Sequence, residues 1–136
     1  MNKYRLVIVE NDQDEQFFMQ EGVKESGLFE LLAMVRNGNV LFEWLKDNPD
    51  NLPDLILSDL NMPGKNGYDV IAELKATPEY QQIPVIITST SGTNATVQKC
   101  YAMGAAGYLV KPETFINYNV FLQDLHALVE EKKLVK

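Results

Sequence analysis

Short apolar runs alternate with longer, mixed stretches along the whole chain. The runs are rich in β-branched residues and lie at 5–9, 31–35, 55–59, 85–89 and 107–110. They are too short for several helical turns and lack regular polar alternation, which is typical of strands that are buried on both faces. The pattern therefore predicts five strands in a sheet that is covered on both sides.

The stretches between these runs repeat apolar residues at helical spacing. They predict helices over 14–26, from Asn39 to Pro49, from Gly67 to Pro78, over 94–103 and over 115–131. Asn39 is expected to cap the second helix, and the two prolines are expected to end the second and third. Strands that alternate with helices indicate a doubly wound parallel α/β sheet with right-handed crossovers.

Length and composition fit one globular domain. The chain has 136 residues, of which 46% are hydrophobic, so we expect a single domain over 1–136 with no output domain. No apolar run approaches the roughly 20 residues of a membrane span, and the amino terminus has no signal-peptide pattern, so a cytoplasmic protein without a membrane partner is expected. The net charge of −7 argues against direct nucleic-acid binding, because the chain would repel a phosphate backbone.

Two reactive side chains are interpreted as structural. Cys100 is the only cysteine and lies in a helix-spaced apolar set, which favours a reduced core thiol over a nucleophile. His126 is the only histidine and follows Leu125 in the last helix, so it is expected to pack or face solvent rather than carry a phosphoryl group.

Polar residues follow the carboxyl ends of four predicted strands, where doubly wound sheets form their ligand crevices. These residues are Glu10, Asn11, Asp12, Asp59, Ser89, Thr90 and Lys111. Their combination suits transfer of a phosphoryl group to a carboxylate, because several phosphoryl oxygens must lie beside the acid while their charge is neutralised. A divalent cation, Mg²⁺, supplies that neutralisation naturally.

The residues divide into chemical roles. Asp59 is the expected nucleophile, Ser89 the hydroxyl donor and Lys111 the opposing positive charge. The expected Mg²⁺ ligands are oxygen donors: Glu10, Asn11 or Asp12, Asp59 and the backbone carbonyl of Asn61. No further cofactor is expected.

Three segments resemble the receiver domain of bacterial two-component response regulators, and the resemblance covers essentially the whole chain. The segments are 57–64 around Asp59, 86–89 ending in Ser89, and 104–112 ending in Lys111-Pro112. The resemblance implies a flavodoxin-like strand order 2-1-3-4-5, Asp59 as phosphoacceptor and Mg²⁺ dependence. It also implies a histidine kinase or histidine phosphotransfer protein as donor, slow self-hydrolysis rather than enzymatic turnover, and a cis peptide before Pro112.

The same resemblance implies a switch. Ser89 moves toward the phosphoryl group, Tyr108 turns into the vacated space, and Thr90 lies beside that path. A downstream target would then be recognised by the face of the fourth helix, fifth strand and fifth helix. The protein is expected as a monomer or as a phosphorylation-dependent homodimer through that face.

One departure from the family leaves alternatives open. The first strand of such domains usually ends in two acids, whereas this chain has Glu10-Asn11, so Mg²⁺ binding is expected to weaken unless Asp12 substitutes. A receiver that has lost phosphotransfer and serves as a docking module is one alternative. A haloacid-dehalogenase-type phosphatase is disfavoured because Asn61 cannot act as the general acid. A flavodoxin-like cofactor binder is disfavoured by acids after the first strand.

Overall fold

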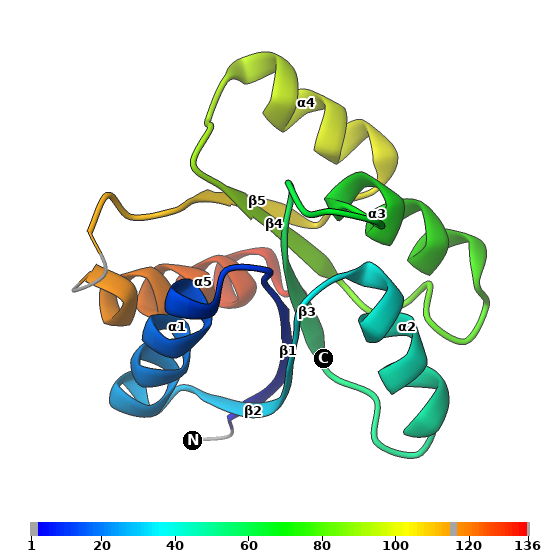
Figure 1. Ribbon diagram of the computed structural model, residues 1–136, viewed down its shortest axis with the longest axis horizontal. Coiled ribbons are helices and arrows are strands. Elements are labelled where there is room, and N and C mark those ends of the chain that lie inside the picture. The colour runs from blue at the N-terminus through cyan, green and yellow to red at the C-terminus, as the bar shows by residue number, and fades with distance from the viewer. Residues whose placement is uncertain (1–2, 115–116, 136) are drawn as a thin grey trace.

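The computed structural model, described over residues 3–114 and 117–135, contains one parallel sheet (Figure 1). Its strand order is β2-β1-β3-β4-β5, and all neighbouring strands are parallel. The strands are β1 (Tyr4–Val9), β2 (Phe29–Val35), β3 (Leu55–Asp59), β4 (Val85–Ser89) and β5 (Gly107–Val110). The predicted fold class and strand order are confirmed.

Five helices in the described ranges cover the two faces of the sheet (Figure 1). They are α1 (Gln13–Ser26), α2 (Gly38–Asp47), α3 (Gly67–Ala76), α4 (Asn94–Met103) and α5 (Tyr118–Lys132). The helices α1 and α5 pack together on one face, whereas α2, α3 and α4 cover the other. The sheet therefore lies as a middle layer between two helix layers.

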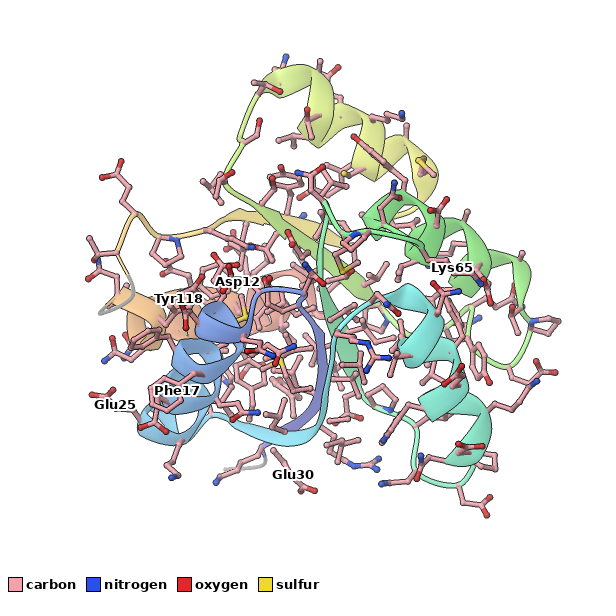
Figure 2. The ribbon with its side chains drawn as sticks, in the orientation of Figure 1. Asp12, Phe17, Glu25, Glu30, Lys65 and Tyr118 are labelled. Carbon is pink, nitrogen blue, oxygen red and sulfur yellow. The ribbon has the colours of Figure 1, made fainter. Side chains whose placement is uncertain are left out.

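Alternate residues of the central strands enter two separate cores, one under each helix layer. Ile56 of β3 joins the core beneath α2, α3 and α4, and the next residue, Leu57, joins the core beneath α1 and α5. Both side chains are fully buried. Side chains from both helix layers fill the space against the sheet (Figure 2). This two-sided burial explains why the strand sequences are almost continuously apolar.

Helix termini account for most differences from the sequence predictions. The side chain of Asn37, not Asn39, caps α2 by accepting a hydrogen bond from Val40 N at 2.9 Å. Asn39 is not the cap, because Asn37 provides the same group two residues earlier, at an extended backbone position. The last helix is described from Tyr118, and residues 115–116 of its predicted start lie outside the described residues.

The peptide bond between Lys111 and Pro112 is trans, because no cis bond occurs among the described residues. The cis expectation is therefore wrong for this structure. A proline amide favours the trans form by only about 0.5–1 kcal/mol, so proline by itself does not determine the isomer.

The single cysteine and the single histidine both pack as predicted. Cys100 is a fully buried free thiol in the core beneath α4. The ring of His126 lies 5.3 Å from that of Tyr4 and 5.8 Å from that of Phe29, measured between centroids. Neither side chain lies near the carboxyl ends of the strands.

Both ends of the described chain lie at the amino-terminal edge of the sheet. The first strand begins at Tyr4, close to the amino terminus. Leu134 and Val135 line a cavity with Pro53 and Pro84, which precede β3 and β4. Within the described residues, no helix is long and apolar enough to cross a membrane.

Candidate functional site

The predicted site residues gather around one open cavity of about 270 Å³ at the carboxyl ends of the strands. Its lining consists of Glu10, Asn11, Asp12, Glu15, Asp59, Asn61, Ser89, Thr90 and Lys111. Every side chain that the sequence nominated lines this cavity except Tyr108. The cavity therefore joins residues from four strand ends, as expected for a doubly wound sheet.

Asp59 ends β3 in a tightly packed position and is 7% exposed. The following residue, Leu60, donates its N–H to Thr88 O at 3.0 Å and accepts from Gly67 N at 2.9 Å. A Cβ at Gly67 would come within 2.8 Å of Leu60 Cα and 2.9 Å of Asp59 O. Only glycine fits there, so Gly67 lets α3 begin directly beside the strand end that carries Asp59.

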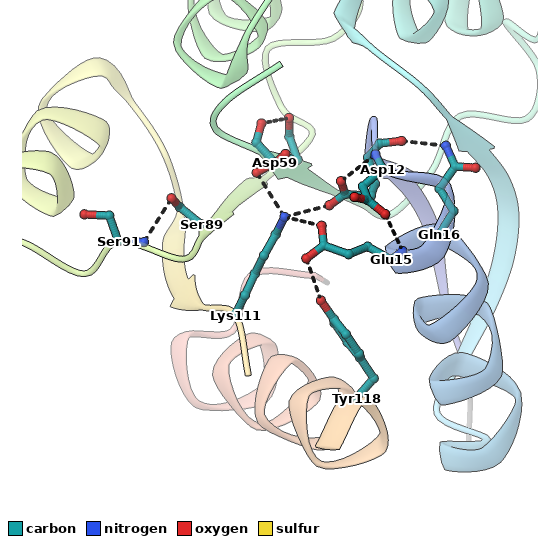
Figure 3. Close-up of polar contacts among 10 residues, drawn as sticks. Asp12, Glu15, Gln16, Asp59, Ser89, Ser91, Lys111 and Tyr118 are labelled. Carbon is teal, nitrogen blue, oxygen red and sulfur yellow. Dashed lines mark hydrogen bonds and ion pairs between the residues drawn. The ribbon is translucent and has the colours of Figure 1, made fainter. Parts of the chain in front are cut away.

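The ammonium of Lys111 contacts three carboxylates (Figure 3). Its Nζ lies 2.7 Å from Glu15 Oε2, 2.9 Å from Glu10 Oε1 and 3.3 Å from Asp59 Oδ1. The backbone of Lys111 continues the sheet by donating its N–H to Ser89 O at 2.8 Å. Lys111 is 8% exposed, so these pairs are largely shielded from water.

Glu10 is 1% exposed and held at several points. Its N–H donates to Val35 O at 2.9 Å, and its carbonyl accepts from Gln16 Nε2 at 2.5 Å. Its second carboxylate oxygen, Oε2, accepts from Asp12 N at 3.0 Å. These contacts fix the Glu10 carboxylate against the cavity wall, with Oε1 in ion-pair contact with Lys111.

Burial shifts the pKa values of the charged groups. Desolvation, assisted by the nearby Asp59 charge, raises the pKa of Glu10 to about 7, although Asp12 N–H and Lys111 act in the opposite direction. Desolvation also raises the pKa of Asp59, against the lowering effect of Lys111. Burial alone would lower the pKa of Lys111, but its contacts with Glu15, Asp59 and Glu10 outweigh burial and raise it. Lys111 therefore stays positively charged.

Asn11 and Asp12 lie at the exposed rim of the cavity. Asp12 is the N-cap of α1, because its Oδ1 accepts from Glu15 N at 3.0 Å. The buried carboxylates left for a cation are those of Glu10 and Asp59. Across the part of the chain that the structure describes, no three carboxylate, histidine or cysteine side chains form a ready metal site.

The donor set nevertheless suits Mg²⁺, which is usually held by one or two carboxylates together with waters. Glu10 and Asp59 offer two carboxylates in one cavity, and Asn11 and Asn61 offer further oxygen atoms at its rim. All are hard oxygen donors of the kind that Mg²⁺ requires. In the described conformation, the ammonium of Lys111 balances part of this negative charge.

Ser89 connects the cavity to Tyr108. Ser89 is 1% exposed, and its Oγ accepts from Ser91 N at 3.2 Å, so its own hydroxyl hydrogen can be donated elsewhere. The hydroxyl of Tyr108, on β5, donates to the carbonyl of Ser91 in the loop that follows β4. Thr90, between Ser89 and Ser91 in the sequence, lies at the exposed cavity rim. The β4–α4 loop therefore touches both Ser89 and the half-buried Tyr108.

Sequence reasoning missed Glu15. It lies in the first turn of α1, where an acid is ordinarily interpreted as a partner of the helix dipole. Its side chain instead bridges Lys111 Nζ and the hydroxyl of Tyr118, which donates to Glu15 Oε1 at 3.4 Å. The position five residues after Glu10 is the only signal that could have indicated it.

Comparison with known proteins finds one family. The sequence model of the response regulator receiver domain matches residues 6–118. The chain is 30% identical to response regulator Rcp1 of Synechocystis sp. over 129 residues, which cover 92% of this chain and 83% of Rcp1.

Solved structures agree in fold. The phosphorylated cyanobacterial phytochrome response regulator RcpA matches with a TM-score of 0.80 and 27% identity, over 91% of each chain. The Mn²⁺-bound form of Rcp1 matches with a TM-score of 0.76 and 27% identity, over 91% of this chain and 92% of Rcp1.

Proposed function

The chain belongs to the response regulator receiver domain family, and on that basis we propose that it accepts a phosphoryl group on Asp59. The donor is a histidine kinase or a histidine phosphotransfer protein. One observation carries the proposal: the carboxylate of Asp59 lies in the strand-end cavity, 3.3 Å from the ammonium of Lys111. The structure of phosphorylated RcpA supports phosphorylation in this family.

The reaction forms one bond and breaks another. An oxygen of the Asp59 carboxylate attacks phosphorus, the bond from phosphorus to the donor imidazole breaks, and the imidazole nitrogen leaves with that electron pair. Lys111 stabilises the negative charge of the transferred phosphoryl oxygens, and the hydroxyl of Ser89 donates a hydrogen bond to them. Hydrolysis later returns Asp59 and inorganic phosphate, which makes the protein a signal carrier rather than a turnover enzyme.

Mg²⁺ would be held by Glu10, Asp59, the Asn61 carbonyl and Asn11 or Asp12. When bound, it supplies positive charge to the phosphoryl oxygens. The Mn²⁺-bound form of Rcp1 supports a divalent cation in a related protein. The amide at Asn11 brings no charge to this set, so we expect weaker cation binding than an aspartate would give.

The phosphorylation signal is transmitted through a rearrangement of Ser89 and Tyr108. New charge on Asp59 would draw the Ser89 hydroxyl toward it and free the space into which Tyr108 turns, with Thr90 beside that path. The target surface is the face formed by α4, β5 and α5. Exposed Tyr101 and Val110 lie on it, and Lys132 of α5 reaches the hydroxyl of Tyr101 at 3.2 Å. A downstream protein or a second phosphorylated copy would bind there.

The test is the intact mass of the protein after incubation with acetyl phosphate, with and without Mg²⁺. We expect a gain of one phosphoryl group that requires Mg²⁺ and is absent in Asp59→Asn. Absence of any adduct on the wild type, together with no binding of beryllofluoride, would contradict the proposal. It would favour the docking module, for which the uncharged Asn11 is the specific observation.

A further inference from the structure

We propose that Glu15 is a positioning residue that draws Lys111 away from Asp59 and so keeps the oxygens of Asp59 available to a cation and a phosphoryl group. The inference rests on the proposed function and adds a residue to it. Glu15 makes the shortest carboxylate contact of Lys111, at 2.7 Å, while Asp59 makes the longest, at 3.3 Å.

The two contacts of Glu15 come from different elements. Lys111 follows β5, and Tyr118 begins α5, so one carboxylate on α1 connects three parts of the chain (Figure 3). The Glu15 side chain is 17% exposed, unlike an acid that only faces solvent at a helix end. The hydroxyl of Tyr118 occupies Glu15 Oε1, and Lys111 occupies Oε2. The position of the carboxylate is therefore set from two sides.

An ammonium group has three hydrogens, and Lys111 has three carboxylate partners. Glu15 and Glu10 can keep two of them while a phosphoryl oxygen replaces Asp59 at the third. Without Glu15, we expect Lys111 to settle between Glu10 and Asp59. Those are the two buried carboxylates proposed as cation ligands, so a bound cation would have to displace the ammonium.

Two substitutions separate position from charge. Glu15→Asp keeps the negative charge but shortens the side chain by one methylene, so the carboxylate no longer reaches Lys111. Glu15→Gln keeps the length but removes the charge. Glu25→Gln is the matched control, because Glu25 is exposed at the opposite end of the same helix and changes the net charge equally (Figure 2).

The decisive measurement is the ¹H–¹⁵N nuclear magnetic resonance signal of the Lys111 ammonium in metal-free protein. We expect a resolved signal in the wild type and in Glu25→Gln, and a shifted or exchange-broadened signal in both Glu15 variants. A Mg²⁺ titration followed by the amide signal of Asn61, without phosphodonor, should show a dissociation constant about tenfold higher in both Glu15 variants. Far-UV circular dichroism establishes that each variant is folded.

The inference is overturned if Glu15→Asp gives the wild-type Lys111 signal, since the negative charge alone, and not the position of the carboxylate, would then explain the effect of Glu15. A wild-type Mg²⁺ constant in both Glu15 variants would overturn it equally. Failure of the proposed function is a separate result, because it is read from the mass of wild-type protein with acetyl phosphate. The ammonium signal tests Glu15 whether or not Asp59 accepts phosphate.

Discussion

Lys111 determines the charge balance of the cavity. Within the described residues, it is the only cation in ion-pair contact with Glu10, Glu15 and Asp59. One positive charge among three carboxylates leaves the buried site negative when all are ionised. A negative, oxygen-lined cavity attracts a divalent cation and repels a phosphate that arrives without one. This balance is a physical reason to expect that cation binding precedes phosphoryl transfer.

Whether Asn11 occupies a cation-ligand position can be tested by replacing its amide with a carboxylate. We expect Asn11→Asp to lower the Mg²⁺ dissociation constant about tenfold, because a carboxylate adds a full negative charge to the ligand set. Isothermal titration calorimetry measures the constant. Asn51→Asp is the control, since Asn51 is exposed in the loop before β3, at the far end of the sheet. Equal or weaker affinity of Asn11→Asp would show that Asn11 does not occupy a ligand position.

Burial of Glu10 predicts a pH dependence of stability in metal-free buffer. Its pKa rises from an ordinary 4.5 to about 7, so the folded protein binds this proton more tightly than the unfolded chain. The resulting stabilisation is present below pH 4.5 and is lost as the pH rises to about 7. We expect this loss to be on the order of 2 kcal/mol in the free energy of unfolding.

Urea unfolding at a series of pH values, with a metal chelator present, measures the effect. Glu10→Gln should remove this part of the decline, because an uncharged amide replaces the protonated acid. Glu30→Gln, on the exposed side of β2, should leave the decline unchanged. Parallel pH curves for the wild type and Glu10→Gln would contradict the expectation.

At the level of residues, the sequence could predict which polar side chains lie at the strand ends, but not which of them contact one another. Asp59 and Lys111 follow apolar runs that leave little choice of position, so their convergence follows from parallel topology alone. Glu15 could not be found in this way, because its partners depend on the packing of α1 against α5. The cap of α1 by the Asp12 carboxylate is also not among the predictions, although Asp12 followed by Glu15 three residues later is a pattern typical of a helix start.

Among the elements, the junction of β3 and α3 is the most constrained. We expect Gly67→Ala to lower the free energy of unfolding by about 1–3 kcal/mol, because its Cβ meets backbone atoms of Asp59 and Leu60. The change should also slow phosphorylation by shifting Asp59. Gly27→Ala is an informative comparison: it has a φ of +67° but no atom within 4 Å of a Cβ.

Urea unfolding measures the loss of stability, and the rate of phosphorylation by acetyl phosphate measures the effect on Asp59. Gly27→Ala should lose about 1 kcal/mol through its left-handed backbone alone, with a normal phosphorylation rate. If Gly67→Ala were phosphorylated at the wild-type rate, the close approach of Gly67 to the backbone of Asp59 and Leu60 would matter only for stability.

Element positions were predictable to different degrees. The predicted strands 55–59 and 85–89 match β3 and β4, because burial on both faces requires apolar residues throughout. The prediction 107–110 also matches β5, although that strand is only partly buried. Helix starts are less certain from sequence, since Asn37 and Asn39 are both suitable caps and only the local backbone distinguishes them. Partly exposed β2 extends two residues before the predicted start at Leu31.

At the scale of the whole molecule, the single sheet contributes buried side chains to both cores. We expect Ile56→Ala and Leu57→Ala each to lower the free energy of unfolding by about 3 kcal/mol, because both remove a fully buried side chain. Trp44, the only tryptophan, packs on the core that contains Ile56. Both variants should still unfold in one transition, because the strands connect the cores.

Trp44 fluorescence and far-UV circular dichroism should give coincident urea transitions in both variants. The Leu57 variant is the stricter test, because its cavity lies on the face of the sheet away from Trp44. A fluorescence transition that stayed at the wild-type midpoint in Leu57→Ala would show that the two layers unfold independently.

The position of the chain ends has a practical consequence. Tyr4 and Val135 lie at the amino-terminal edge of the sheet, whereas the cavity with Asp59 opens at the carboxyl edge. A fluorescent protein or a surface-attachment tag joined through a flexible linker at either end would therefore extend away from the cavity. The chain could be immobilised or tracked by such fusions while its phosphorylation is measured.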